Sequence, residues 1–354
     1  MNESQKLLDE VLSIALAEQS SDLHLVPNNP PILRVNRRLV VLIKKKKLDF
    51  NDTQALAFLL MTEEQKENFV KNKEIDFSYT YEKKARFRVN IFFQNEGISI
   101  ALRLINREIK TISELNLPEV LHEFLKATEG LFLVVGPSSH GKSTTLAAMI
   151  DEVNHQQQSH ILTIEDPIEY IFENNQSIIE QREVGKDTAT FAKAIRASLR
   201  QDPDVLMIGE MRDQESMSTA LTAAETGHLV LSTLHTMSAS QTINRIIDVF
   251  SSEQQNQIRF QLSSTLLGIV SQRLIPSTEG GLIPACEILV SNPAIRNLIR
   301  ENKIHEIPLI ISTSRDEGMV SLDYALGDLI RKDKISMENA LRYSLNPNEL
   351  RKLI

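Results

Sequence analysis

The stretch Gly136-Pro137-Ser138-Ser139-His140-Gly141-Lys142-Ser143 reads G-x-x-x-x-G-K-S, the pattern of a phosphate-binding P-loop. A short apolar run at residues 131–135 precedes it and indicates a buried strand, and residues 144–150 continue it as a helix. Strand, glycine-containing loop and helix in this order are the context that the motif requires. A chance glycine-rich turn before a lysine would lack these flanks, so the sequence predicts a nucleotide site here.

The residue types of the loop explain how it would hold phosphate. Gly136 and Gly141 permit backbone torsions that side chains exclude, so successive N–H groups can point at one anion, and the helix N-terminus adds partial positive charge. Lys142 is expected to reach the β- and γ-phosphates of ATP, and the Ser143 hydroxyl to bind Mg²⁺. We expect the whole loop to line the nucleotide: Gly136, Pro137, Ser138, Ser139, His140, Gly141, Lys142, Ser143 and Thr144.

Composition narrows the class of protein. The chain has 354 residues, enough for two or three domains, and no apolar run of 18 or more residues. Its N-terminal residues show no signal-peptide pattern, and the single Cys286 excludes an intrachain disulfide and a multi-cysteine zinc site, so a reduced, cytoplasmic setting is expected. The net charge of −8 argues against a nucleic-acid partner. We interpret the four lysines at 44–47 as a solvated loop, with contact to anionic lipid or a polar partner as the alternative.

Hydrophobic patterning divides the chain into an α/β protein of two main parts. Residues 1–105 mix strands with helices at 7–15 and 55–60, the second capped by Asn51 or Asp52, and indicate a small α+β domain. Residues 106–117 are polar and suit a linker. Residues 118–237 begin with a helix at 119–128 and then alternate strand and helix, which predicts a doubly wound parallel sheet with strands at 161–164, 205–208 and 229–233. Residues 238–354 are predicted to form a helical subdomain.

Acidic residues follow two of these predicted strands. Glu210 comes directly after the apolar run 205–208, the arrangement of a Walker B acid, and can hold Mg²⁺ or its waters. Glu165, Asp166 and Glu169 follow the strand at 161–164, and one of them is a candidate to orient the attacking water. Solvated strand-end turns are the alternative for this second group.

Histidines and arginines supply further candidates. His228 and His235 flank the strand at 229–233, where they could sense the γ-phosphate or shape a subunit interface; their spacing is poor for metal ligands. Arg88 and Arg103 lie on strands of the first domain and invite an arginine-finger role, although ordinary surface arginines are the more economical interpretation. Arg196 and Arg200 are four residues apart and are predicted to share a helical face.

Taken together, the segments 136–143, 163–169, 209–213 and 223–236 resemble those of the secretion ATPase superfamily, which powers type IV pili and type II secretion. Segments 21–25, 85–90 and 294–301 extend the resemblance to nearly the whole chain, and the last is similar to a motif associated with pilus retraction. Extension ATPases of this superfamily usually carry a four-cysteine zinc site and a longer N-terminal region. This chain has one cysteine and starts almost directly at the small domain, so the resemblance favours the retraction branch.

The resemblance implies a PAS-like first domain, a RecA-like second domain, a ring of six subunits and ATP bound between the two domains of a subunit. It assigns the catalytic glutamate to Glu169, the Walker B acid to Glu210 and the histidine box to His228 and His235. The remaining matches are first-domain arginines that approach the phosphates, Arg88 and Arg103, and a second arginine pair near the nucleotide, Arg196 and Arg200.

The function that the resemblance implies is an ATP-hydrolysing motor, at the cytoplasmic face of the inner membrane, that withdraws pilin through a PilC-like platform protein. The alternatives are a PilU-like accessory motor or a pilus-assembly or secretion ATPase and, in another class, a RecA-type nucleic-acid translocase. The acidic balance and the absence of an aromatic-basic stripe argue against the translocase.

The P-loop departs from the pattern of the retraction ATPases. Ser138-Ser139-His140 stands where these proteins commonly have Thr-Gly-Ser, and His140 adds bulk where the backbone must approach phosphate closely. Because both defining glycines remain, we expect a working loop, with slower turnover or altered nucleotide affinity as the consequence to test.

Overall fold

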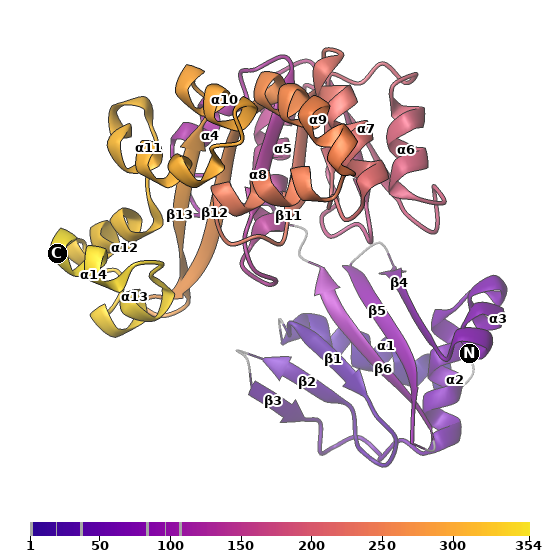
Figure 1. Ribbon diagram of the computed structural model, residues 1–354. Helices are drawn as coiled ribbons and strands as arrows, with labels where there is room; N and C mark the ends of the chain where they lie inside the picture. The colour runs from indigo at the N-terminus through magenta and orange to yellow at the C-terminus, as the bar shows by residue number, and fades with distance from the viewer. Residues whose placement is uncertain (1–2, 19, 36–37, 83–84, 96, 106–107) are drawn as a thin grey trace. The chain divides into compact units, whose positions relative to one another are not determined.

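The computed structural model describes residues 3–18, 20–35, 38–82, 85–95, 97–105 and 108–354 (Figure 1). The chain forms two compact units. Unit 1 comprises Met1–Glu108 and the short segment Glu169–Ile171, and unit 2 comprises Ile109–Ile168 and Phe172–Ile354.

Unit 1 is built on a six-stranded antiparallel sheet in the order β3-β2-β1-β6-β5-β4. Its strands are β1 (Asp22–Leu25), β2 (Ile32–Val35), β3 (Arg38–Val41), β4 (Glu74–Tyr81), β5 (Ala85–Gln94) and β6 (Gly97–Ile105). Alternate residues of β5, such as Phe87, Val89 and Ile91, are fully buried, while those between them stay partly exposed. This period of two leaves one apolar and one polar face.

Three helices, α1 (Glu3–Ala17), α2 (Phe50–Leu60) and α3 (Glu63–Asn72), contribute side chains to the core with the apolar face of this sheet. The predicted amphipathic first helix is present, with Leu8, Val11, Leu12 and Ala15 buried. The predicted cap of α2 is wrong, because the helix begins earlier. Asp49 caps it by accepting from the N–H of Asp52, which lies inside the first turn. Strand β3 and helix α3 were not predicted.

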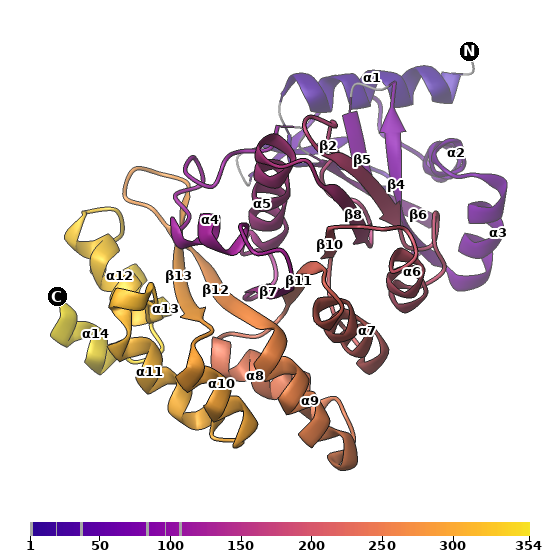
Figure 2. The ribbon, with the colours of Figure 1, turned by 90° about the horizontal axis from the view of Figure 1, so that it is seen from above.

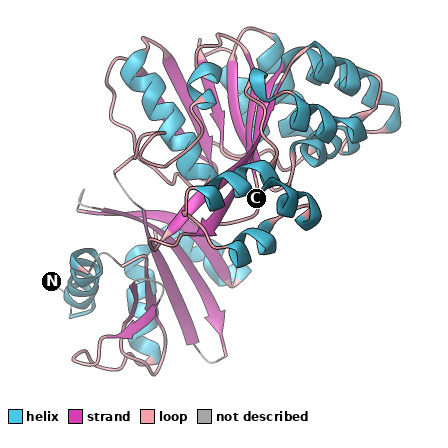
Figure 3. Ribbon diagram, turned by 90° about the vertical axis from the view of Figure 1, so that its left-hand side faces the viewer, coloured by secondary structure: helices cyan, strands magenta, loops and turns pink. Residues whose placement is uncertain are grey.

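Unit 2 contains a seven-stranded sheet in the order β13-β12-β7-β11-β10-β8-β9 (Figure 3). The strands are β7 (Gly130–Val135), β8 (His160–Glu165), β9 (Ile178–Glu183), β10 (Val205–Ile208), β11 (Leu229–Leu234), β12 (Leu266–Pro276) and β13 (Leu282–Val290). All neighbouring pairs are parallel except β12 with β13. The predicted parallel sheet is therefore present, with one antiparallel edge strand.

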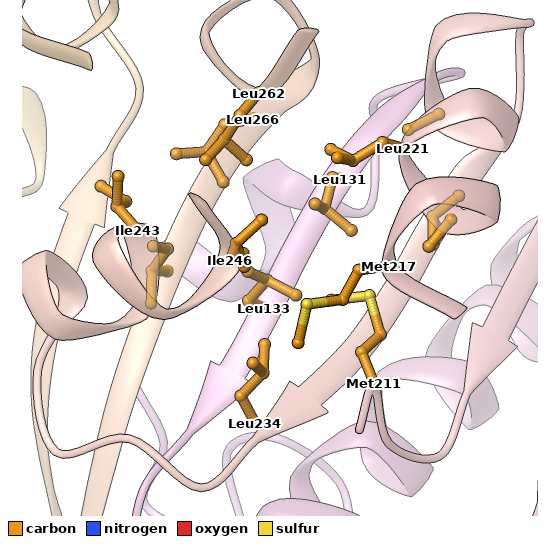
Figure 4. Packing of buried hydrophobic residues seen from close by; sticks show 14 of the residues in the cluster. Leu131, Leu133, Met211, Met217, Leu221, Leu234, Ile243, Ile246, Leu262 and Leu266 are labelled. Atoms are coloured by element: carbon orange, nitrogen blue, oxygen red, sulfur yellow. The ribbon is translucent and has the colours of Figure 1, made fainter. Parts of the chain in front are cut away.

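Helices cover both faces of this sheet, as the alternation along β7 requires. Phe132 and Val134 join a core with α4 (Val120–Phe124) and α5 (Lys142–Gln156). Leu131 and Leu133 join the other core, with α6 (Phe191–Ser198), α7 (Gln214–Glu225), α8 (Ala239–Asp248) and α9 (Ser252–Thr265) (Figures 2 and 4). Strands buried on both faces explain the continuous apolar runs of the sequence.

The expectation that residues 238–354 are helical is wrong for 266–290. Leu266–Pro276 and Leu282–Val290 form β12 and β13, which pair over nine residues and extend the sheet beside β7. Short apolar runs do not distinguish a buried strand from a buried helix, which explains the error. The remainder is helical as predicted: α10 (Pro293–Arg300), η1 (Ile304–Glu306), α11 (Ile307–Thr313), η2 (Arg315–Glu317), α12 (Leu322–Arg331), α13 (Met337–Tyr343) and α14 (Pro347–Leu353).

Two smaller expectations also differ from the structure. Residues 109–117 of the predicted linker pack onto unit 2, since Ile112 and Leu117 are buried in its core; residues 106–107 lie outside the described residues. The helix expected at 119–128 is limited to Val120–Phe124. Over the described part of the chain, no helix combines the length and the apolar character needed to cross a membrane.

Candidate nucleotide site

Three neighbouring strands of unit 2 bring the principal candidates to one edge of the sheet. Strands β7, β11 and β10 are adjacent and parallel, so the residues that follow them meet at their carboxyl ends. The P-loop follows β7, His235 follows β11, and Glu210 follows β10 after Gly209. The middle strand therefore places His235 between the loop and the acid.

The backbone of the loop needs glycine at both defining positions. Gly136 has φ +145°, and a β-carbon there would stand 2.3 Å from the carbonyl oxygen of Gln272. Gly141 has φ +82° and opens helix α5. Ser139 also takes a positive φ, +63°, a region that costs an L-residue about 1 kcal/mol. Glycine at this position would adopt the same torsion without that cost.

Lys142 is held inside the turn of the loop. Its side chain is buried, and Nζ donates to the carbonyl oxygens of Gly136 at 2.9 Å and Pro137 at 3.0 Å. Because the ammonium group sits within the curve that the loop amides make, it is positioned to meet an anion bound there.

His235 connects the loop lysine to the strand-end acid. Its Nδ1 lies 3.3 Å from Lys142 Nζ and 3.2 Å from Ser138 Oγ, and its Nε2 lies 3.3 Å from Glu210 Oε1. An ammonium group can only donate, so Nδ1 accepts and Nε2 carries the hydrogen that faces Glu210. The imidazole thus forms a continuous polar link between the Walker lysine and Glu210.

Arg212 holds the other side of Glu210. Its Nε donates to Glu210 Oε2 at 2.8 Å, and its Nη1 lies 3.5 Å from Asp166 Oδ2. Because β10 neighbours β8, this guanidinium ties together the ends of both strands. The carboxylate of Glu210 is therefore oriented by His235 on one oxygen and by Arg212 on the other.

The donors at this edge fit a magnesium–nucleotide complex. Ser143 is exposed at the start of α5 and offers a hydroxyl, and Glu210 offers a carboxylate; both are the hard oxygen ligands that Mg²⁺ prefers. Among the described residues, no group of three or more His, Cys, Asp and Glu side chains could hold a metal ion.

The three carboxylates after β8 occupy different settings. Glu165 is buried and accepts from Thr163 Oγ1 at 2.7 Å and from Gln181 Nε2 at 3.2 Å, two bonds within unit 2. Asp166 faces Arg212. Glu169 groups with unit 1, where its Oε1 lies 4.0 Å from Arg88 Nη1. Its role in orienting water stays a prediction.

The other predicted site residues of unit 2, His228, Arg196 and Arg200, have separate settings. His228 directly precedes β11 and contacts the carbonyl oxygen of Ala223 at 3.0 Å, so a strand of six residues, roughly 20 Å, separates it from His235. Helix α6 runs back from β9 toward the start of β10, and Arg196 in its last turn pairs with Glu215 of α7. The helix ends at Ser198, so the prediction that Arg196 and Arg200 share one helical face is wrong. The length of β11 therefore keeps His228 away from the P-loop of its own chain.

The first-domain arginines stand on the polar face of the sheet in unit 1. Arg88 and Arg103 are direct cross-strand partners on β5 and β6. Each has an acid at hand: Arg88 Nη2 donates to Asp76 Oδ2 at 2.7 Å, and Arg103 Nε donates to Asp22 Oδ1 at 3.0 Å. Although burial alone would raise the pKa of Asp22, hydrogen bonds from Ser21 and Arg103 hold that pKa below its ordinary value.

Sequence reasoning missed two residues of the site. Arg212 stands two positions after Glu210 in a segment that was singled out, but no role was derived for it. Gln272 lies on β12, in a stretch that was predicted to be helical, and its side chain bonds both Thr145 and the backbone of His140. No local signal in the sequence marks a glutamine that acts from a strand 130 positions downstream.

Comparison with known proteins agrees with this geometry. Residues 2–313 match the family described as type II/IV secretion system protein. The chain is 45% identical over 333 residues to the type IV pilus retraction ATPase PilT of Pseudomonas aeruginosa, covering 94% of this chain and 96% of that protein. It is 39% identical to the type IV pilus ATPase PilU of the same organism, covering 98% and 91%. A crystal structure of the pilus retraction motor PilT with bound ADP superposes with a TM-score of 0.91 at 44% identity, covering 97% of this chain and 98% of that one.

Proposed function

Since the chain belongs to the type II/IV secretion ATPase family, we propose that it is an ATP-hydrolysing motor that drives retraction of a type IV pilus. The observation that carries the proposal is the single edge at which the P-loop, His235 and Glu210 meet, in a chain that matches a retraction ATPase over almost its full length. The higher identity to PilT than to PilU favours the main retraction motor over an accessory one.

The residues of this edge suit phosphoryl transfer to water. The loop amides and Lys142 would stabilise the charge that develops on the transferred phosphoryl group. Ser143 and Glu210 would hold Mg²⁺, which when bound neutralises the phosphate oxygens. His235 would hold Lys142 and Glu210 in fixed positions relative to each other. Because its ring also contacts Ser138, a movement of the loop would shift the ring.

Glu169 is proposed to position or deprotonate the attacking water, and Arg88 and Arg103 to contact the phosphates. Both arginines are already oriented by carboxylates, which fixes their direction at low entropic cost. Loss of the γ-phosphate would release such contacts, and hydrolysis would then move one unit against the other. In the terms of the family, unit 1 is proposed to be PAS-like and unit 2 RecA-like.

A ring of six chains is proposed for the assembled motor. His228 lies at the sheet edge opposite the P-loop, so any action of this histidine on nucleotide would have to be on that of a neighbouring copy. We therefore propose that His235 senses the γ-phosphate and that His228 lies at a subunit interface.

The motor is proposed to work at the cytoplasmic face of the inner membrane, against a PilC-like platform protein, and to cooperate with a PilU-like paralogue where one is present. A nucleic-acid translocase remains the alternative of another class. Stimulation of ATP hydrolysis by DNA would favour it.

Deletion of the gene in its host, with surface pili and twitching scored together, tests the proposal. Abundant pili without twitching are expected, and complementation with the wild-type gene but not with Lys142→Ala should restore movement. Loss of pili altogether would contradict a retraction role and indicate an assembly or secretion motor. The ATPase chemistry would survive that result.

A further inference from the structure

Strand β12 continues past the end of its neighbour β7. The two strands pair up to Ser271 and Val135, where β7 ends and the P-loop begins, whereas β12 runs on to Pro276. Beyond Ser271 the inner edge of β12 therefore faces the P-loop in place of another strand. Backbone groups along that edge need partners, because a buried unpaired N–H costs about as much as a lost hydrogen bond.

His140 of the P-loop forms hydrogen bonds with this part of β12 through both its side chain and its backbone. The N–H of Leu274 donates to Nδ1 of His140 at 2.9 Å, and Gln272 Nε2 donates to the carbonyl oxygen of His140 at 2.9 Å. The Oε1 atom of the same glutamine accepts from Thr145 Oγ1 at 2.8 Å. His140 is thus fixed at its ring and at its backbone, directly before Gly141 turns the chain into α5.

The ring of His140 lies against β12. It meets Tyr343 of α13 edge-on, with ring centroids 6.4 Å apart. Burial lowers the pKa of His140, and the nearby charges of Arg273 and Lys142 lower it further, which keeps Nδ1 available as an acceptor.

Tyr343 connects this contact to the C-terminal helices. Its carbonyl oxygen accepts from the buried Arg273 of β12. Helices α12, α13 and α14 lie beside the far end of the β12–β13 hairpin (Figure 1) and share a separate small core with it. The hairpin contributes Ile275 and Ile283 to this core, and the helices contribute Leu326 and Leu350. One direct side-chain path from these helices to the P-loop runs through the rings of Tyr343 and His140.

We propose that His140 is a positioning residue that clamps the closing turn of the P-loop to β12, and that the C-terminal helices adjust nucleotide affinity through the contact between Tyr343 and His140. The inference rests on the proposed nucleotide site. A side chain too short to reach the N–H of Leu274 would leave this contact unmade.

Isothermal titration of the full chain with ADP tests this inference. His140→Ala should weaken ADP binding about tenfold, the size of one buried hydrogen bond left unmade. His140→Asn places an amide oxygen close to the former position of Nδ1 and should restore most of the affinity. His155→Ala, on the exposed end of α5, is the matched control and should bind as the wild type does.

Rescue by asparagine separates a positioning role from general damage to the fold, and Tyr343→Ala provides a second variant should His140→Ala not fold. Tyr343→Ala should weaken ADP binding by a smaller factor, about threefold, while its carbonyl contact with Arg273 remains. Wild-type affinity in both His140→Ala and Tyr343→Ala overturns the inference. ADP binding by Lys142→Ala is measured in the same way. If this variant bound ADP as tightly as the wild type does, the proposed nucleotide site itself would be wrong.

Discussion

The two sheets of this protein place their charged groups in different ways. In unit 2 the reactive groups stand at the ends of parallel strands, where Lys142, His235 and Glu210 form a chain of contacts at one edge. In unit 1 the charges stand on the face of an antiparallel sheet, where Arg88 and Arg103 sit side by side on neighbouring strands, each against a carboxylate.

The difference shows what each kind of sheet can supply. Parallel strands all point one way, so one edge collects loops and helix N-termini that suit an anion. An antiparallel face offers a fixed lattice of side chains, and like charges in direct register are tolerated only with acids beside them. We therefore expect substitutions at the strand ends of unit 2 to reduce the rate of ATP hydrolysis strongly. Substitutions on the sheet face of unit 1 should cause smaller changes, in stability or in the coupling between nucleotide and motion.

Lys142→Ala should have the largest effect. Removing a buried ammonium group from the phosphate cradle is expected to reduce ATP hydrolysis about 100-fold or more, with little change in thermal unfolding measured without nucleotide. Hydrolysis is measured by phosphate release. Lys126→Ala, a change at an exposed lysine paired with Glu123, should leave the rate unchanged.

The two histidines that flank β11 offer a matched pair. His235→Ala breaks the link between Lys142 and Glu210 and should slow hydrolysis about tenfold at every protein concentration. His228→Ala, at the other end of the strand, should slow it only at concentrations where chains assemble. Equal effects at high dilution would show that the two ends of the strand are not functionally distinct.

Asp22→Asn tests the charged face of unit 1 and should lower the free energy of unfolding by about 1 kcal/mol at pH 7, since one partner of the contact, Arg103, is largely exposed. Because the folded pKa of Asp22 lies below the ordinary value of 3.8, its stabilisation is present above that value and disappears as the pH falls through the folded pKa. Asparagine does not titrate. Urea unfolding of the two proteins should therefore converge as the pH is lowered, and a constant difference would contradict the assignment.

Cys286 should give the smallest response. It is buried within the core between β13 and its neighbours, and burial raises the pKa of its thiol to about 12. The thiolate is the reactive form, so a maleimide reagent at pH 8 should label the denatured protein and not the native one. Rapid native labelling would show that this edge of the sheet opens readily.

The elements of the nucleotide site were predictable where they are local. The G-x-x-x-x-G-K-S pattern with its strand and helix, and the acid after residues 205–208, each depend on a few consecutive residues, and the structure places both at the expected edge. The conclusion that His235 and not His228 faces the P-loop needed strand order, because β11 lies between β7 and β10.

The contributions of β12 could not be predicted in this way. Its residues 266–270 form an apolar run that is compatible with helix or strand, and its pairing with β7 joins residues that are 135 or 136 positions apart, such as Leu266 with Leu131 and Ser271 with Val135. Gln272 and the contact between His140 and Leu274 follow from that pairing alone. The same limit applied to the cap of α2, where three acidic or amide residues compete and only the geometry selects Asp49.

The central proposal is that Glu169 positions or deprotonates the water that attacks ATP. Hydrolysis by Glu169→Gln, measured together with ATP binding, tests it most directly. Glutamine keeps the shape of the side chain and removes the base, so we predict wild-type ATP affinity with hydrolysis reduced about 100-fold or more. Turnover at the wild-type rate in this variant would contradict the account.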